Sequence, residues 1–161
     1  MNGIPRARRA SKPVRVTLAP ELGGGIDGAW WPHSSAIAAE LPDLIGALHR
    51  ALGEIETIQI NWSATEGQLD LETIATGSRM MLPGEHHRRP RLMSIVGRNA
   101  GAKLLVVPSM TSQALGTMVL RTAAGLPASI ETESGRLYET ACVVLGLART
   151  ESAKWCEPAG S

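Results

Sequence analysis

Aromatic residues are scarce in this chain. It contains no phenylalanine and one tyrosine, and aromatic residues make up only 3% of its 161 residues. Two of its four tryptophans are nevertheless adjacent, at Trp30 and Trp31 in the stretch GIDGAWWPHSS. Because each tryptophan ring can bury a large area, this pair is the first candidate for a core or binding role.

Cysteine and long apolar runs are scarce as well. Cys142 and Cys156 show neither CxxC spacing nor a pattern with histidine, so we expect no disulfide scaffold and no zinc site. The best apolar runs, ACVVLGLA and KLLVVP, are far shorter than the roughly 18 to 20 residues of a membrane span. No apolar segment typical of a signal peptide follows the basic N-terminus. We therefore expect a cytoplasmic protein with no membrane contact, no metal and no cofactor.

Charged residues are few and unevenly placed. They make up 19% of the chain, against 43% hydrophobic residues, which is typical of a folded domain. Residues 1–20 contain five basic side chains and no acidic one, whereas the rest of the chain contains 11 basic and 15 acidic side chains. We expect residues 1–12 to form a solvated basic arm, and the alternative is that this arm attracts nucleic acid weakly.

The first half of the chain shows one strand and one long helix. Val14–Leu18 alternates apolar and polar residues and predicts a strand. A helical period then begins at Ser34 or Ser35, either of which can cap the helix, and ends at Gly53. Pro42 predicts a kink or a junction of two helices. The apolar positions of this face are Ile37, Leu41, Leu44, Ile45, Leu48 and Leu52.

Four further strands and two helices are predicted beyond Gly53. Residues 54–62 alternate, with Ile58, Ile60 and Trp62 on one side, and residues 69–76 form a second strand with a bulge near Thr73. The segments RLMSIVG and KLLVVP predict an antiparallel hairpin. The segment TSQALGTMVLRTAAG predicts a helix that begins at Thr111 or Ser112 and ends at Gly125. Residues 136–149 predict a final helix, with a strand as the alternative, and residues 151–161 a frayed tail.

This order of elements predicts an α+β fold. Consecutive strands with short turns favour a mainly antiparallel sheet, and two one-sided helices would cover it as a two-layer sandwich, with the extra C-terminal helix. The predicted organisation is a basic arm over residues 1–12, an α+β domain over 13–126 and a C-terminal extension over 127–161.

Several segments together resemble a known family. They are VTLAPELGGGIDGAWWPHSSAIAAELPDLIGAL, the strand that ends in Trp62, and LLVVPSMTSQALGTMVL. The chain resembles, over about residues 14–125, an actinobacterial family of small uncharacterised proteins with a D-G-A-W-W-P signature. That family has no assigned activity, so the resemblance implies one cytoplasmic domain of actinobacterial origin and no particular function.

The tryptophan pair is open to two interpretations. Consecutive residues in extended backbone point to opposite sides, so Trp30 and Trp31 are not expected to share one pocket. We expect one ring to fill the core and the other to line a surface groove used for binding, on a loop beside the sheet. The alternative is that both rings are packing residues beside Trp62.

Polar residues near the pair suggest further candidates. Asp27 and His33 flank it as a carboxylate and an imidazole suited to acid–base chemistry, although Asp27 before a glycine is also an ordinary turn residue. Arg88 and Arg89 can hold an anion, whereas the adjacent histidines of EHHRR beside these cations disfavour a metal site. The candidate binding residues are Trp30, Trp31, His33, Asp27, Trp62, Arg88 and Arg89.

Three functions follow from these candidates. The favoured hypothesis is a non-catalytic module that binds a small molecule or a protein through the Trp30/Trp31 loop. The second is an enzyme that acts on an anionic small molecule through Asp27 and His33. The third is a weak nucleic-acid binder that uses the basic arm, since stacking on one exposed indole contributes about 1 to 3 kcal/mol per base.

Overall fold

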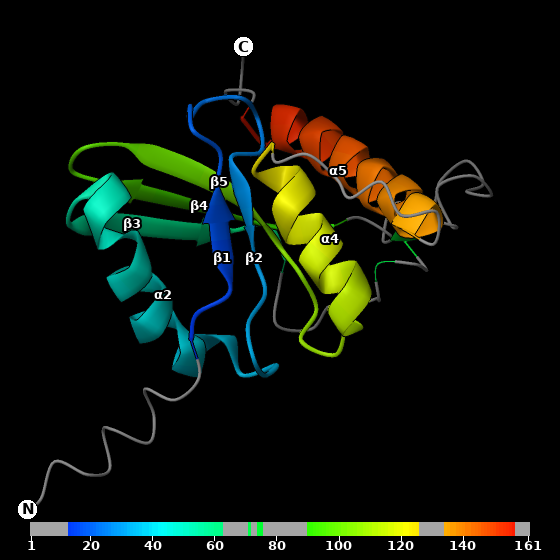
Figure 1. Ribbon diagram of the computed structural model, residues 1–161. Coiled ribbons are helices and arrows are strands. Elements are labelled where there is room, and N and C mark those ends of the chain that lie inside the picture. The colour runs from blue at the N-terminus through cyan, green and yellow to red at the C-terminus, as the bar shows by residue number, and fades with distance from the viewer. Residues whose placement is uncertain (1–12, 63–70, 72–73, 76–89, 126–133, 157–161) are drawn as a thin grey trace, which may run out of the picture.

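A five-stranded mixed sheet and three helices make up the fold of the computed structural model, which describes residues 13–62, 71, 74–75, 90–125 and 134–156 (Figure 1). The elements in chain order are β1 (Val16–Leu18), β2 (Gly28–Trp30), α2 (Ile37–Leu52), β3 (Ile55–Ile60), β4 (Arg91–Gly97), β5 (Gly101–Val106), α4 (Gln113–Ala123) and α5 (Ser134–Cys156).

The sheet has the strand order β1-β2-β5-β4-β3. The neighbouring inner strands β2 and β5 are parallel, with Gly28 opposite Leu104 and Trp30 opposite Val106. The other three pairs are antiparallel, including the predicted hairpin of β4 and β5. The predicted α+β class with a mainly antiparallel sheet is therefore confirmed.

Helices lie on both faces of this sheet, so the expected two layers become three (Figure 1). Leu104 and Val106 face α2, whereas Leu105 and Val107 face α4 and α5. The α2-side cluster consists of Trp30, Leu44, Leu48, Leu52, Met93, Ile95, Ala102, Leu104 and Val106. The α4/α5-side cluster includes Ala29, Trp31, Leu71, Ile74, Leu92, Leu105, Val107, Leu115, Val119, Ala141, Val144, Leu145 and Ala148. The continuous apolar run LLVV is typical of a strand buried on both faces, and this signal contradicts a two-layer fold.

The helix α2 is a single element with Pro42 inside it, which rules out the expected alternative of two helices. Proline removes one backbone hydrogen bond and costs about 3 kcal/mol inside a helix. Burial of Leu44, Leu48 and Leu52 outweighs this cost, because each buried leucine contributes about 1.5 to 3 kcal/mol. The helix ends as predicted at Gly53, whose φ of 82° suits glycine.

The start of α2 differs from the expected serine cap. Its N-cap residue is Ala36, which makes no side-chain capping bond. Ser34 instead accepts a hydrogen bond from the Ala36 N–H at 3.2 Å and donates one to Glu40 at 2.8 Å. The serine therefore orders the turn before the helix rather than the helix end itself.

The strand expected over residues 69–76 is wrong in its described part. Leu71, Ile74 and Ala75 have helical backbone and are buried in the α4/α5-side cluster. Their i, i+3, i+4 spacing is the helical period, and the phase break at Ile74 was its sign. The other residues of that segment lie outside the described part.

The strand predicted over 54–62 is confirmed as β3. Ile58 and Trp62 pack against the α2-side cluster, whereas Ile60 is 43% exposed. The expected common apolar side is thus only partly buried, because β3 is an edge strand with one paired neighbour.

The two later helices follow the helical interpretation of the sequence. Ser112 caps α4 by accepting the Leu115 N–H at 3.2 Å, and Gly125 follows with a φ of 79°. Residues 134–156 form α5, so the strand alternative is wrong and the expected frayed tail is helical as far as Cys156. No helix in the described ranges is long and apolar enough to span a membrane.

Candidate functional site

The two adjacent tryptophans point to opposite faces of the sheet, as predicted. Trp30 is the last residue of β2 and lies in the α2-side cluster, and Trp31 lies in the α4/α5-side cluster. Their exposed fractions are 1% and 2%. The expectation that one ring lines a surface groove on a loop is therefore wrong, because the pair ends a central strand that is covered on both faces.

Trp31 is held by contacts to its indole N–H, its ring face and its backbone carbonyl. Its indole N–H donates to the Ser109 carbonyl at 3.3 Å, and the Arg15 guanidinium lies 3.7 Å from the ring centroid. Arg15 also donates to the carbonyl oxygens of Trp31 at 3.1 Å and Pro32 at 3.0 Å. Burial lowers the pKa of the Arg15 guanidinium, and the nearby Glu40 carboxylate partly opposes this shift. Trp31 is therefore a buried packing residue.

Asp27 and His33 are not brought together. Asp27 precedes β2 and His33 follows its end, so that the strand separates them. The His33 imidazole lies 2.7 Å from the Pro13 carbonyl oxygen, and its backbone N–H donates to Glu40 at 3.1 Å. Asp27 has different partners altogether. The structure thus gives no support to the predicted acid–base pair.

The remaining candidates are also apart from Asp27 or outside the description. Trp62 packs against the α2-side cluster, and the Arg91 guanidinium lies 4.9 Å from its ring centroid. Arg88 and Arg89 lie outside the described residues. Within the described ranges, no three His, Cys, Asp or Glu side chains gather to hold a metal ion.

The Asp27 carboxylate ties the glycine turn, Gly23–Gly25, to strand β5. It is only 3% exposed. One of its oxygens accepts the N–H groups of Gly23 at 2.6 Å and Gly24 at 3.1 Å, and the other accepts the N–H of Lys103 at 2.9 Å. Hydrogen bonds to an ionised carboxylate are about twice as strong as neutral ones, so three of them make Asp27 a firm anchor.

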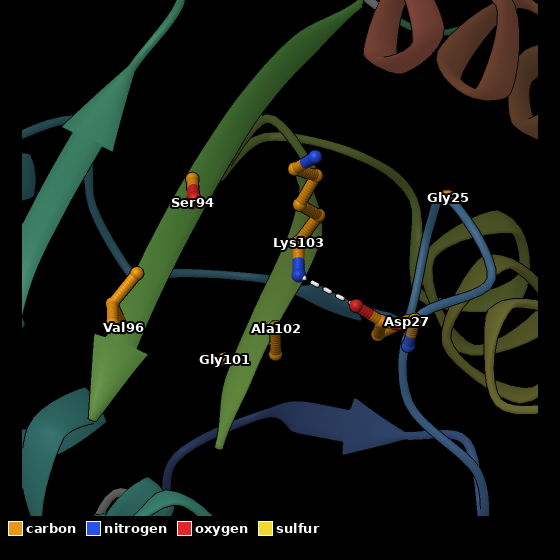
Figure 2. A pocket seen from close by; sticks show the side chains of 8 residues that line it. Gly25, Asp27, Ser94, Val96, Gly101, Ala102 and Lys103 are labelled. Atoms are coloured by element: carbon orange, nitrogen blue, oxygen red, sulfur yellow. Dashed lines mark hydrogen bonds between the residues drawn. The ribbon is translucent and has the colours of Figure 1, made fainter. Parts of the chain in front are cut away.

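A pocket of about 270 Å³ lies beside this anchor (Figure 2). Its lining residues are Gly23, Gly25, Asp27, Ser94, Val96, Gly101, Ala102 and Lys103. Ser94 is paired with Lys103 across β4 and β5, and Val96 with Gly101. Directly opposed residues share a face of the sheet, so these two pairs form the floor and the glycine turn forms a wall.

Lys103 contributes a positively charged side chain to the lining of this pocket. Its side chain extends away from the Asp27 carboxylate, which bonds to the Lys103 backbone instead (Figure 2). In the described part of the chain no ion pair engages the Lys103 ammonium. The Asp27 oxygens accept three backbone N–H groups and form no ion pair with the Lys103 ammonium in the described part of the chain, so a ligand can approach this ammonium directly.

Sequence reasoning found Asp27 and missed Lys103 and Ser94. Both missed residues stand at polar positions within otherwise apolar strands, on the face that α4 and α5 cover elsewhere. A single polar residue inside an apolar strand was the sequence signal that could have identified them. Their approach to Asp27 depends on the pairing of β2 with β5, which no local pattern specifies.

A family model describes most of the chain. It matches residues 15–123 and is that of a family of unknown function, DUF5994. The chain belongs to this family. No curated protein and no solved structure matches the chain. All eight pocket residues lie within the matched range, whereas α5 lies beyond it and reaches the pocket through Ser152, whose hydroxyl donates to the Gly25 carbonyl at 2.8 Å.

Proposed function

We propose that this protein is a non-catalytic binding module that holds a small molecule with an anionic group in the pocket beside Asp27. The Lys103 ammonium on the pocket floor, which forms no ion pair within the described part of the chain, carries the proposal. Ligand sites combine a hollow with a few convergent polar groups. A volume of about 270 Å³ is just below the range of roughly 300 to 1,000 Å³ usual for drug-sized ligands, which favours a small one.

The hydrogen bonds and burial of Asp27 argue against its use as a general base and favour binding. A general base needs a lone pair within hydrogen-bond reach of the substrate. Both oxygens of Asp27 are directed to backbone N–H groups, and the carboxylate is 3% exposed. Besides Asp27, the described lining residues with a polar side chain are Ser94 and Lys103, which can donate hydrogen bonds to an anion. Asp27 therefore fixes the shape of the pocket, and Lys103 supplies its positive charge.

The Trp30/Trp31 segment then acts as scaffold for binding instead of contact surface. Both rings anchor β2, and β2 positions Asp27 and the glycine turn at its amino end. Rigid elements beneath a site lower the entropy lost when a ligand binds. We also keep, as proposals from the sequence, a cytoplasmic location, an actinobacterial origin and a weak attraction of the basic arm to nucleic acid.

The experiment compares Lys103→Gln with Arg50→Gln in anion titrations. Arg50 is exposed on α2, across the sheet from the pocket, so both variants lose one positive charge but only one loses it at the site. Inorganic phosphate, sulfate and acetate are titrated at constant ionic strength and followed by thermal unfolding and by amide NMR shifts of Gly23–Asp27 and Lys103.

At least one anion should stabilise the wild type and Arg50→Gln equally, by up to about 2.7 kcal/mol at a concentration 100 times Kd. The same anion should leave Lys103→Gln unchanged. Equal stabilisation of all three proteins, or shifts confined to other regions, would disprove a binding site at Lys103.

A further inference from the structure

Gly101 is a glycine that the fold itself does not require. It begins β5, where glycine weakens a strand relative to alanine. Its φ is not among the left-handed values, which occur at Gly23, Gly25, Gly53 and Gly125. A Cβ built at Gly101 would lie 3.5 Å from the Ile95 carbonyl oxygen and 3.8 Å from Val96 Cγ2, which is ordinary van der Waals contact. A side chain would therefore fit.

Other glycines of the sheet have structural reasons that Gly101 lacks. A Cβ at Gly28 would collide with the Thr17 carbonyl, and one at Gly97 with the Leu52 carbonyl. No bulge explains Gly101 either, because the β4–β5 register runs without a break as far as its own pair with Val96. Glycine in a strand without such a reason often marks close approach of a ligand.

We infer that the open space over Gly101 receives the apolar part of the ligand, and that the ligand is a small carboxylic acid with a short aliphatic chain. The inference rests on the proposed function. Val96, opposite Gly101, is 43% exposed and offers an apolar surface on the pocket floor. The Ser94–Lys103 pair lies two residues further along the same face, about 7 Å away.

This layout places charge and apolar surface at the two ends of one floor. The ligand carboxylate is bound by the Lys103 ammonium and the Ser94 hydroxyl, and its chain lies over Gly101 and Val96. A single cation beside the buried Asp27 carboxylate favours one negative charge over two, since like charges close together are unfavourable. A monocarboxylate therefore fits better than a phosphate dianion.

The test measures the affinities of acetate, butyrate and hexanoate for wild type, Gly101→Ala, Gly101→Val and Lys103→Gln. Gly46→Ala is the control, because Gly46 is exposed on α2 and a Cβ there meets nothing within 4 Å. Titrations are followed by NMR, and each unliganded variant is first checked for a thermal midpoint no lower than that of wild type.

Affinity of wild type and Gly46→Ala should rise about fourfold for each methylene buried, from acetate to butyrate. Gly101→Val should abolish this gain and keep acetate affinity within about twofold, and Gly101→Ala should fall between. Lys103→Gln should weaken all three acids at least tenfold.

Two results overturn the inference in distinguishable ways. If acetate binding depends on Lys103 but chain length has no effect, or if Gly101→Val keeps the gain, the chain does not lie over Gly101 and only the proposed function survives. If no acid binds in a manner that depends on Lys103, the inference fails, and the proposed function fails with it only if phosphate and sulfate show no binding that depends on Lys103 either. If Gly101→Val does not fold, Gly101→Ala is measured with the same three acids. A gain in affinity with chain length equal to that of wild type then contradicts the inference.

Discussion

The indole ring of Trp31 occupies the space that a side chain at position 116 would need, so β2 and α4 meet at Gly116. Alanine at this position would collide with the six-membered ring of the indole. A glycine inside a helix usually costs about 1 kcal/mol relative to alanine. The close contact with the Trp31 ring explains why α4 has glycine at this position.

Gly116→Ala should therefore destabilise the protein by about 1 to 3 kcal/mol through overpacking. Trp31→Ala should cost about 3 to 5 kcal/mol, and the double variant less than the sum, because the truncated ring frees the space. Chemical denaturation measures all three. Gly146→Ala, at an exposed site of α5 where a Cβ meets nothing within 4 Å, is the control and should be neutral or slightly stabilising. If Gly116→Ala and Gly146→Ala change the free energy of unfolding by the same amount, the Trp31–Gly116 contact is contradicted.

The apolar face of α2 gives a second prediction. Leu44 and Leu48 are 0% and 1% exposed under the sheet. Leu44→Ala or Leu48→Ala should lower the free energy of unfolding by about 2 to 5 kcal/mol, whereas Asp43→Ala on the exposed side should change it by less than about 0.5 kcal/mol. Urea unfolding checks the difference, and losses of the same size at Leu44 and Asp43 would contradict the assigned face.

The elements with a clear period could be predicted from the sequence. The leucines of α2, the serine cap of α4 and the hairpin of β4 and β5 depend on contacts within a short segment. The strand β2 is only three residues long, and its glycine serves a close approach to Thr17. No period can be read from so short a strand, and the sequence therefore predicts a loop for the tryptophan pair.

The layers and the site depend on pairing between distant segments. The parallel register of β2 with β5 brings Asp27 to Lys103, and residues 76 apart in sequence carry no local sign of it. The same pairing places Trp30 and Trp31 in a doubly covered strand, which buries both rings. Residue types alone identified Asp27 but not its role as an anchor.

The basic arm provides a third prediction. Residues 1–12 are polar and basic and contain no apolar period. A chain that begins at Pro13 should keep its thermal midpoint and lose any salt-sensitive affinity for a random DNA duplex. Calorimetry and anisotropy titrations at two salt concentrations measure these quantities. A large loss of stability on truncation would show that the arm contributes to the core.

The anchor role of Asp27 provides a fourth prediction. Asp27→Ala leaves three backbone N–H groups without their acceptors and should cost at least about 2 kcal/mol, since one buried unpaired donor costs about 1 to 3 kcal/mol. Asp27→Asn keeps one oxygen acceptor and should cost less. Equilibrium unfolding compares them. A loss well below about 2 kcal/mol in Asp27→Ala would contradict the anchor role, and identical losses in the two variants would show that the oxygen kept by asparagine contributes nothing.

The last prediction concerns α5, which lies beyond the family match yet holds the glycine turn. Ser152 is 1% exposed, and its hydroxyl donates to the Gly25 carbonyl at 2.8 Å. Removing this bond should let the turn open locally without unfolding the sheet, because Asp27 still ties it to β5. Ser152→Ala should raise amide hydrogen exchange in Gly23–Asp27 several-fold and leave exchange in β4 and β5 unchanged. The matched control is Thr150→Ala, which removes an exposed hydroxyl bonded to Gly146 within the same helix and should alter neither region. If both variants accelerate exchange in the turn equally, the effect comes from α5 stability and the Ser152–Gly25 bond does not position the turn.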